Sequence, residues 1–334
     1  MLRRRLVSCD DVSSMTDEDL AGTCLRIAST ALEFAAMARQ PDKAHLLRPA
    51  RQKKHKSIAN KTRRVDLAIQ AVIDAQLKAA FPSVLILGEE VKRYPKNLAA
   101  VAKDLVAIVD PVDGTDLLAR GFSNWCCSLV MFSPKERRIR AAVVAHSDGD
   151  LYWATEDGAF KSRRDGTGFV RSKLAVQRPH GFSLAQASVC FYGQKPERIV
   201  STANALRFEA MQQPSDPNSA KFRIYNLGGN PMMVKIPDGD VDIVFELKGQ
   251  EVHDVLPGAF IALHAGAVIR GVDKSEIELN RAALFPRERM RYVLAATSRL
   301  QEEFSSLIKS GGAETGVKTA IPRIHRTPKR RVSV

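Results

Sequence analysis

The feature that most constrains this chain is an apolar run over residues 105–109 that passes directly into the sequence Asp-Pro-Val-Asp-Gly-Thr. An apolar run of this length, ended by Asp-Pro and Asp-Gly, predicts a buried strand that enters a tight turn. Asp110 and Asp113 lie three residues apart at this corner and can point at one spot. Because two like charges persist together mainly when a cation neutralises them, the corner predicts a metal site.

An anion site is predicted beside the two aspartates. Gly114 and Thr115 lead into residues 116–120, which we interpret as a helical turn with free backbone N–H groups at its start. Such groups, together with the helix dipole, suit an anion. A metal site next to an anion site indicates phosphate chemistry. The alternative is an Asp-rich turn that only caps a helix.

The composition is that of a globular protein. Its 334 residues, 45% of them apolar, are enough for a sizeable core in one large domain or two tightly packed ones. The five cysteines are an odd number without a C-x-x-C pair, so we expect reduced thiols rather than a disulfide framework or a structural zinc site. No apolar run is long enough to span a bilayer. We therefore expect a soluble, cytoplasmic protein with no membrane partner.

The net charge of +14 is concentrated in two segments. Residues 43–64 hold nine Lys or Arg and no acid, and the residues after Glu314 carry only basic charges. Such segments are solvated arms, or they attract polyanions, either phosphorylated substrates or nucleic acid. Neither segment contains an aromatic residue, which leaves stacking on single-stranded bases unsupported.

Hydrophobic periodicity predicts two helices and then a meander of strands. Thr16 is the predicted N-cap of a first helix that ends before Pro41, and a second helix covers residues 66–80. A short strand over residues 84–87 follows. Strands separated by Gly-, Asp- and Ser-rich turns then predict an antiparallel sheet, at 128–132, 138–145, 150–155, 159–163 and 168–172.

Beyond residue 186 strands and helices alternate, which indicates a sheet covered by helices. The strands are predicted at 187–191, 223–225 and 242–245, and the helices at 199–211, 231–236 and 255–265. We therefore predict a flexible N-terminus (1–15), an α+β half with an antiparallel sheet and most metal ligands (16–180), an α/β half (181–312) and a basic tail (313–334).

Three further acids lie at the ends of predicted elements. Asp66 begins a helix, Glu89 ends a strand, and Asp254 begins another helix. Each one alone is most simply a helix cap or a surface acid. Taken together with Asp110 and Asp113 they form a set that suits a hard, oxygen-preferring cation, since no dense group of His or Cys favours zinc.

Three motifs in the same order make the chain resemble a known family. They are Gly-Glu-Glu at 88–90, Asp-Pro-Val-Asp-Gly-Thr at 110–115, and the stretch from His-Asp at 253–254 through Pro-Gly to Ala-Gly at 265–266. Weaker matches are Thr-x-x-x-Asp at 62–66 and Leu-Gly-Gly-Asn at 227–230. Over roughly residues 16–300 the chain resembles the inositol monophosphatase branch of the magnesium-dependent, lithium-sensitive phosphatases, a superfamily that includes fructose-1,6-bisphosphatase.

The resemblance implies a layered α/β fold, the five-layer αβαβα sandwich of this superfamily, with two or three Mg²⁺ ions. The metal ligands that it implies are Glu89, Asp110, the carbonyl of Val112, Asp113, Asp254 and, for a third ion, Asp66. Thr115 and Glu89 would activate the attacking water. Backbone N–H groups of Gly114 and Thr115 would bind the phosphate. The substrate contacts that it implies are Glu246 and the turn formed by Gly228, Gly229 and Asn230.

The chain differs from the family's usual sequence at several positions, and none of these differences removes a carboxylate. His253 replaces the usual Trp, Leu118 the usual Phe, and Ala267 the second Gly of Ala-Gly-Gly. His253 is either a substrate contact or a packing substitution. The turn at Gly229 also differs from the small-residue turn of the family, which leaves the substrate open.

The expected function is magnesium-dependent hydrolysis of a small polyol or sugar phosphate, and the resemblance implies a homodimer. Fructose-1,6-bisphosphatase and 3'(2'),5'-bisphosphate nucleotidase activities are alternatives within the class. An RNA- or transcription-associated binding protein on the same fold is an alternative of another class, for which the basic segments are the only support.

Overall fold

The computed structural model describes residues 14–49, 64–89, 94–101, 103–165, 168–193, 196–206 and 222–308. Several predictions concern residues outside these ranges. They are the flexible N-terminus up to residue 13, most of the basic segment 43–64, the end of the helix predicted at 199–211 and the basic tail 313–334.

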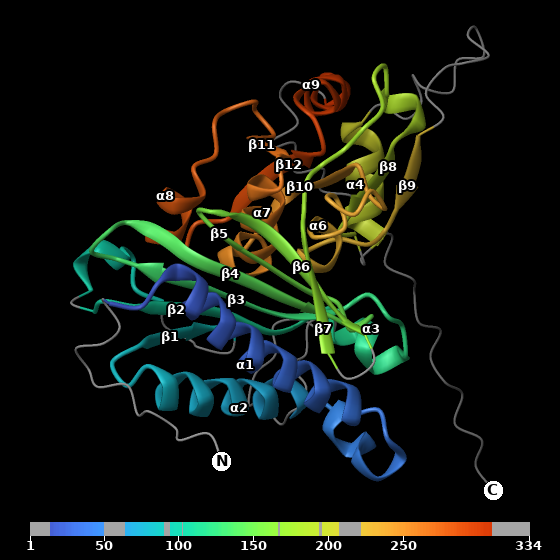
Figure 1. Cartoon of the computed structure of the whole chain (residues 1–334). Coiled ribbons are helices and arrows are strands. Elements are labelled where there is room, and N and C mark those ends of the chain that lie inside the picture. The colour runs from blue at the N-terminus through green and yellow to red at the C-terminus, as the bar shows by residue number, and fades with distance from the viewer. Residues whose placement is uncertain are drawn as a thin grey trace, which may run out of the picture.

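Two β-sheets alternate with three layers of helices (Figure 1). α1 (Asp17–Met37) and α2 (Arg64–Ala80) cover one face of the first sheet. α7 (Leu256–His264) packs against the other face of that sheet and against the second sheet, whose far side is covered by α9 (Ser298–Leu307). This order of layers confirms the predicted αβαβα sandwich. The remaining helices are α3 Thr115–Arg120, α4 Pro196–Ala205, α6 Asn230–Met233 and α8 Leu279–Leu284, with 3-10 helices η1 Pro41–Leu47, η2 Leu98–Ala100, η3 Leu184–Gln186 and η4 Val252–Asp254.

The first sheet has seven strands in chain order, and the predicted meander is confirmed. β1 pairs with β2 in parallel, and every later neighbour is antiparallel. The strands are β1 Leu85–Gly88, β2 Val106–Asp113, β3 Cys126–Ser133, β4 Arg138–His146, β5 Leu151–Thr155, β6 Gly158–Asp165 and β7 Gly168–Lys173.

The second sheet has five strands in the order β11-β12-β10-β8-β9. β10 runs parallel to β8 and antiparallel to β12. Residues beyond Gly266 had no predicted elements, so β11, β12, α8 and α9 are additions to the prediction. The strands are β8 Ser188–Phe191, β9 Arg223–Tyr225, β10 Ile243–Gln250, β11 Val268–Gly271 and β12 Met290–Ala295.

The predicted caps and apolar patterns explain how the first half forms. Thr16 caps α1, since its hydroxyl oxygen accepts a hydrogen bond from the Asp19 amide at 3.1 Å. β2 is buried on both faces: Val106 and Ile108 belong to the core between the sheets, whereas Ala107 and Val109 pack under α1 and α2. A strand buried on both faces reads as a continuous apolar run, which is why the sequence identified it.

The turn predicted at residue 110 begins later than expected. β2 continues through Pro111 to Asp113, and the pairing with β3 shifts register between Asp110 and Asp113. A proline has no N–H for the ladder and is tolerated where regular pairing is interrupted. The two aspartates therefore lie at an irregular strand end, and the turn begins only at Gly114.

A network of ion pairs joins the first sheet to the segment after α6. Lys161 Nζ lies 2.8 Å from Asp150 Oδ2 and 2.7 Å from Asp238 Oδ2. Lys235 Nζ lies 2.6 Å from Asp148 Oδ2. We call the six residues the ion-paired network: Asp148, Asp150, Asp238, Lys161, Arg163 and Lys235.

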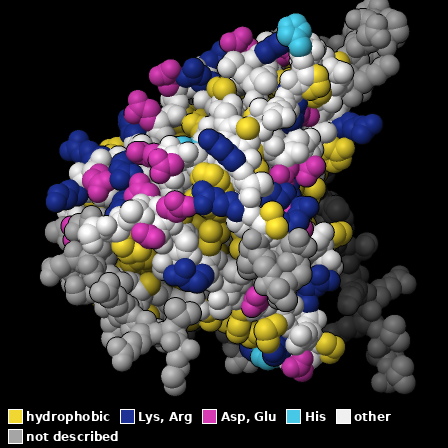
Figure 2. All heavy atoms as spheres, viewed as in Figure 1, with side chains coloured by type: hydrophobic (Ala, Val, Ile, Leu, Met, Phe, Trp, Pro, Cys, Tyr) yellow, Lys and Arg dark blue, Asp and Glu magenta, His cyan; other side chains and the backbone are white. Residues whose placement is uncertain are grey.

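Two observations on the described residues concern nucleic-acid and membrane partners. Figure 2 shows basic and acidic side chains intermixed on the face that it presents. None of the helices that the structure describes is both long and apolar enough to cross a membrane.

Candidate active site

The site is built around the end of β2. Asp110 and Asp113 are only 1% and 8% exposed, and the backbone turns immediately after them at Gly114. Gly114 has φ +94°, and a side chain there would come within 3.0 Å of the Asn124 carbonyl oxygen. The corner therefore needs glycine, which lets α3 begin directly behind the aspartates.

Five carboxylates converge around Asp110. Burial raises the pKa of Asp110 well above its ordinary value, and the negative charges of four other acids raise it further. We call the five acids the acidic cluster: Asp66, Glu89, Asp110, Asp113 and Asp254. These are the five acids that the sequence singled out; four lie on α2, β2 and η4, and Glu89 directly follows β1.

Asp113 is held by the turn that begins α6. Its Oδ2 accepts a hydrogen bond from the Asn230 amide at 2.7 Å. Gly229 has φ +75°, and a side chain there would lie 2.5 Å from the same oxygen. Burial and the charge of Asp254 nevertheless raise the pKa of Asp113 to about 8. The Asp113 carboxylate is thus held in position in surroundings that disfavour its charged form.

The side chain of Asn230 connects β3 to η4 and α7. It is fully buried, and its Nδ2 donates to the His253 carbonyl oxygen at 2.9 Å and to Ser128 Oγ at 3.3 Å. Its Oδ1 accepts from the Gly258 amide at 2.8 Å. The side chain that we predicted to contact substrate is thus bonded to protein groups on both its atoms, and the substrate contact stays a prediction.

Thr115 links α3 to α2. Its hydroxyl lies 2.9 Å from both Asp66 Oδ1 and the Val112 carbonyl oxygen, so a single proton serves two acceptors. Val112 is in turn fixed by its amide, which donates to Asp110 Oδ1 at 3.0 Å. The predicted catalytic hydroxyl and the predicted carbonyl ligand therefore lie side by side.

Glu89, Asp110 and His253 bring three possible ligand atoms within 4.8 Å of one another. Glu89 is exposed, whereas His253 is only 2% exposed. Carboxylate oxygens and an imidazole nitrogen at this separation can share one cation, and the raised pKa values of Asp110 and Asp113 show that burial and neighbouring acids disfavour their charged forms. The donor set therefore fits a divalent metal ion.

The predicted polyol contact lies on β10 at the edge of this site. Glu246 is 4% exposed, and it accepts a hydrogen bond from the Lys248 amide at 2.5 Å and lies 3.4 Å from Arg198 Nη1. Burial raises the pKa of Glu246, and the charge of Asp254 adds to the increase. Glu246, Arg198 and Tyr192 line one narrow crevice.

Two tyrosines near the acids were missed by the sequence analysis. Burial raises the pKa of Tyr192, and the charges of Asp113 and Asp254 raise it further. Tyr94 donates from its hydroxyl to the Gly88 carbonyl oxygen at 2.7 Å. Both lie in irregular segments, where no periodicity or spacing pointed to them.

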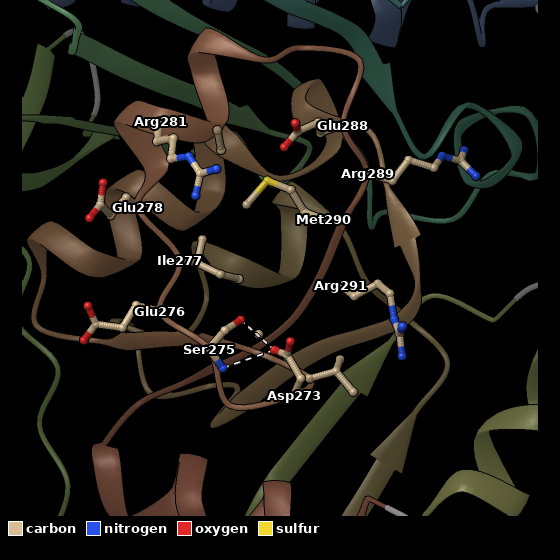
Figure 3. A pocket seen from close by; sticks show the side chains of 13 residues that line it. Asp273, Ser275, Glu276, Ile277, Glu278, Arg281, Glu288, Arg289, Met290 and Arg291 are labelled. Carbon is tan, nitrogen blue, oxygen red and sulfur yellow. Dashed lines mark hydrogen bonds between the residues drawn. The ribbon is translucent and has the colours of Figure 1, made fainter. Parts of the chain in front are cut away.

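A larger hollow is lined by residues of the C-terminal part of the second sheet (Figure 3). It encloses about 280 Å³ and is lined by residues of the β11–α8 segment and of β12. Arg281, Ile277 and Met290 point toward one another across it, while Arg289 extends away (Figure 3). Arg289 Nη2 lies 3.5 Å from Glu251, but no member of the acidic cluster lines the hollow. The hollow is therefore not the site of the predicted chemistry.

Comparison with known proteins decides the family. Residues 23–312 match the model of the inositol monophosphatase family, which is most of the chain. The chain belongs to the inositol monophosphatase family. Members of this family are phosphatases and depend on metal ions, so the acidic cluster lies in a protein for which metal binding is expected.

Relatives and solved structures agree with this assignment. Inositol monophosphatase 2 of Solanum lycopersicum is 25% identical over 254 residues, which cover 75% of this chain and 86% of the relative. The extragenic suppressor protein suhB from Bartonella henselae aligns with a TM-score of 0.65 at 17% identity, over 88% of this chain and 99% of that one. An IMPase from Thermotoga maritima aligns with a TM-score of 0.64 at 17% identity, over 86% and 96%. At these identities the structural likeness shows the fold.

Proposed function

We propose that this protein hydrolyses a phosphate monoester of a small polyol or sugar, with magnesium as the resident ion. The observation that carries the proposal is the convergence of Asp66, Glu89, Asp113 and Asp254 on the buried Asp110. The buried carboxylates among them, such as Asp110 and Asp113, are costly to hold close together in the charged form unless divalent ions neutralise them. When bound, such ions would make a water more acidic and would stabilise the charge of the phosphoryl group in the transition state.

The chain's own residues have defined tasks in this proposal. Glu89, Asp110, Asp113, Asp254 and the Val112 carbonyl would hold two ions, and Asp66 would help to hold a third. The Thr115 hydroxyl, between Asp66 Oδ1 and the Val112 carbonyl, would orient the attacking water together with Glu89. The amides of Gly114 and Thr115 would bind phosphate oxygens. No covalent intermediate on the protein is required.

The substrate hydroxyls would lie toward β10. The charge of Asp254 helps to raise the pKa of Glu246, which supports a place for Glu246 near the acidic cluster. Because Arg198 lies 3.4 Å from Glu246, the chain also offers a cation there that could receive a second phosphate. Bisphosphates of sugars and nucleotides are therefore the alternatives to test against monophosphates.

Release of inorganic phosphate from a panel of esters tests the proposal. The panel contains inositol, sugar and nucleotide monophosphates and the corresponding bisphosphates, each with Mg²⁺ and with EDTA. We expect magnesium-dependent release from a polyol or sugar monophosphate, and a raised KM for that substrate in Glu246→Gln. Absence of release from every ester, with the protein folded and metal-loaded, would show that the family's activity has been lost here.

The homodimer and the nucleic-acid partner remain separate proposals with simple tests. Light scattering on the full chain distinguishes a monomer from a dimer. RNA affinity that falls with rising salt and with deletion of residues 318–334 would support the binding alternative. Binding unaffected by both changes would remove it.

A further inference from the structure

His253 is placed among the acids as a ligand would be. One of its ring nitrogens lies within 4.8 Å of carboxylate oxygens of both Glu89 and Asp110. The side chain is only 2% exposed, so the imidazole cannot turn away into solvent without disturbing the core. Its residue backbone is fixed as well, because the carbonyl oxygen accepts the hydrogen bond from Asn230.

Tyr94 fixes the orientation of the His253 imidazole ring. The Tyr94 ring stacks on it, with centroids 6.3 Å apart and planes 11° from parallel. Tyr94 is itself anchored through its hydroxyl to the Gly88 carbonyl oxygen, next to Glu89. The ring of His253 is therefore oriented from the same strand end that carries the glutamate.

Either ring nitrogen of His253 has a partner for its proton. Nδ1 lies 3.3 Å from the Tyr94 hydroxyl oxygen, and Nε2 lies 3.5 Å from Asp254 Oδ1. A histidine that binds a metal uses the lone pair of one nitrogen and donates its other N–H to a carboxylate, a hydroxyl or a carbonyl. In both tautomers one nitrogen is thus satisfied and the other is left with a lone pair.

We propose that His253 supplies a nitrogen ligand to the ion held by Glu89 and Asp110, so that the site binds Mn²⁺ more tightly than Mg²⁺. Mg²⁺ prefers an all-oxygen shell, whereas an imidazole is a good ligand for first-row transition ions. This inference rests on the proposed metal-dependent phosphatase site and adds to it the identity of one ligand and the order of metal preference.

Pulsed electron paramagnetic resonance of the full-length protein loaded with one equivalent of Mn²⁺ tests the ligand directly. We expect modulation from a directly bound imidazole ¹⁴N, replaced by the ¹⁵N pattern when the protein is made with ¹⁵N-histidine. His253→Phe should lose the modulation and keep the stacking partner of Tyr94. His264→Phe is the matched control and should retain it, because that ring packs on Phe260 at the end of α7.

Titration calorimetry measures the preference. We expect the ratio of Mn²⁺ to Mg²⁺ affinity to fall by about tenfold in His253→Phe, within the range reported for loss of a group that supports a metal site. His253→Gln, which keeps a polar group at the position, guards against a misfolded Phe variant and should show the same fall. An unchanged ratio in a folded variant would contradict the inference.

The outcomes separate this inference from the proposed function. If the wild-type protein releases phosphate with Mg²⁺ but shows no ¹⁴N modulation with Mn²⁺, His253 is not a ligand and the phosphatase proposal stands. If the modulation is present and no ester is hydrolysed, the ligand assignment stands and the proposed function fails.

Discussion

Two groups of buried carboxylates in this molecule differ in the source of their counter-charge. In the ion-paired network, burial by itself raises the pKa of Asp150, but hydrogen bonds from Arg163 and Lys161 outweigh it and hold the pKa below its usual value. In the acidic cluster, burial and the charges of neighbouring acids raise the pKa values of Asp110 and Asp113. The chain's own cations therefore neutralise the first group, and we propose that a metal ion neutralises the second.

The contrast shows that the same type of residue, a buried aspartate, can contribute to stability in one region and to the proposed function in another. Each group includes acids at strand ends of the first sheet: Asp110 and Asp113 at the end of β2, and Asp150 directly before β5. In the network, neutralised acids join the sheet to the segment after α6. In the acidic cluster, repulsion among the acids opposes folding, and a bound cation would recover that unfavourable energy as metal affinity.

The largest expected effect comes from Asp113→Asn. Phosphatase activity should fall by more than about 100-fold, since even the loss of an outer partner of a metal ligand costs 10–100-fold. In EDTA at pH 8 the same variant should be more stable than wild type by at least about 1 kcal/mol, because one raised pKa unit corresponds to about 1.4 kcal/mol. Steady-state kinetics and urea unfolding measure the two effects.

Asp150→Asn is the control for that variant, taken from the ion-paired network. It should lower stability in EDTA and leave the activity of the folded protein unchanged. If Asp113→Asn destabilises the metal-free protein to the same degree, the two regions do not differ as described.

Thr115→Val tests the neutral hydroxyl that lies beside the acidic cluster and bonds to Asp66. Activity should fall by about 100-fold, the scale of a lost proton-transfer or orienting group, whereas Thr115→Ser should stay within about tenfold of wild type. Loss of the bond to Asp66 should cost stability by only about 1 kcal/mol. Equal activity of the Val and Ser variants would remove Thr115 from the chemistry.

The pH dependence of stability gives a smaller effect that separates the two regions in the wild-type protein. An acid whose pKa is raised on folding stabilises the protein fully below its unfolded pKa, and this stability is lost as pH rises through the folded pKa. For Asp113 the loss runs between the ordinary value of 3.8 and about 8. In EDTA the Tm should therefore fall from pH 5 to pH 8.

A divalent ion should reverse this fall. At a concentration 100-fold above the Kd for pH 8 the gain at pH 8 is about 2.7 kcal/mol, or about 4 °C in Tm, and the same concentration should give a smaller gain at pH 5. Thermal scans with and without Mg²⁺ or Mn²⁺ provide the measurement. A gain independent of pH would mean that the acids bind the ion without releasing protons.

The smallest expected effect is that of Lys161→Met. It removes one cation shared by Asp150 and Asp238, while Arg163 and Lys235 remain close to those acids. We expect a loss of about 2 kcal/mol, below the 3–5 kcal/mol of a pair left wholly uncompensated. The loss, followed by urea unfolding, should be the same with and without metal. A loss that disappears when metal is added would couple the two regions.

The sequence predicted the parts of the fold that are decided locally. The apolar run before Asp110 and the cap at Thr16 each have a cause within a few residues, and so do the Gly- and Asp-rich turns of the meander. Pro111 was expected to end β2, but the bulge against β3 allowed the strand to continue. Neighbouring strands, which the local sequence does not show, decided that position.

The acids of the candidate site were found from motifs, whereas the contacts that hold them in place were not. Asp110 and Asp254 stand in recognisable contexts. Tyr94 is defined only by its contacts with the Gly88 carbonyl and the His253 ring, and Asn230 by bonds to residues more than 20 positions away. Long-range contacts of this kind follow from packing of the two sheets, and no spacing of residues in the sequence predicts them.

The bonds of Asn230 also affect when the site can form. They join Asp113 and Ser128 of the first sheet to His253 and Gly258, which are synthesised more than 100 residues later. A growing or half-folded chain therefore contains the first four acids without the clasp that positions Asp113 or the fifth acid, Asp254. If the acidic cluster binds a cation as proposed, only the fully folded molecule would bind it tightly, and metal affinity would then report complete folding.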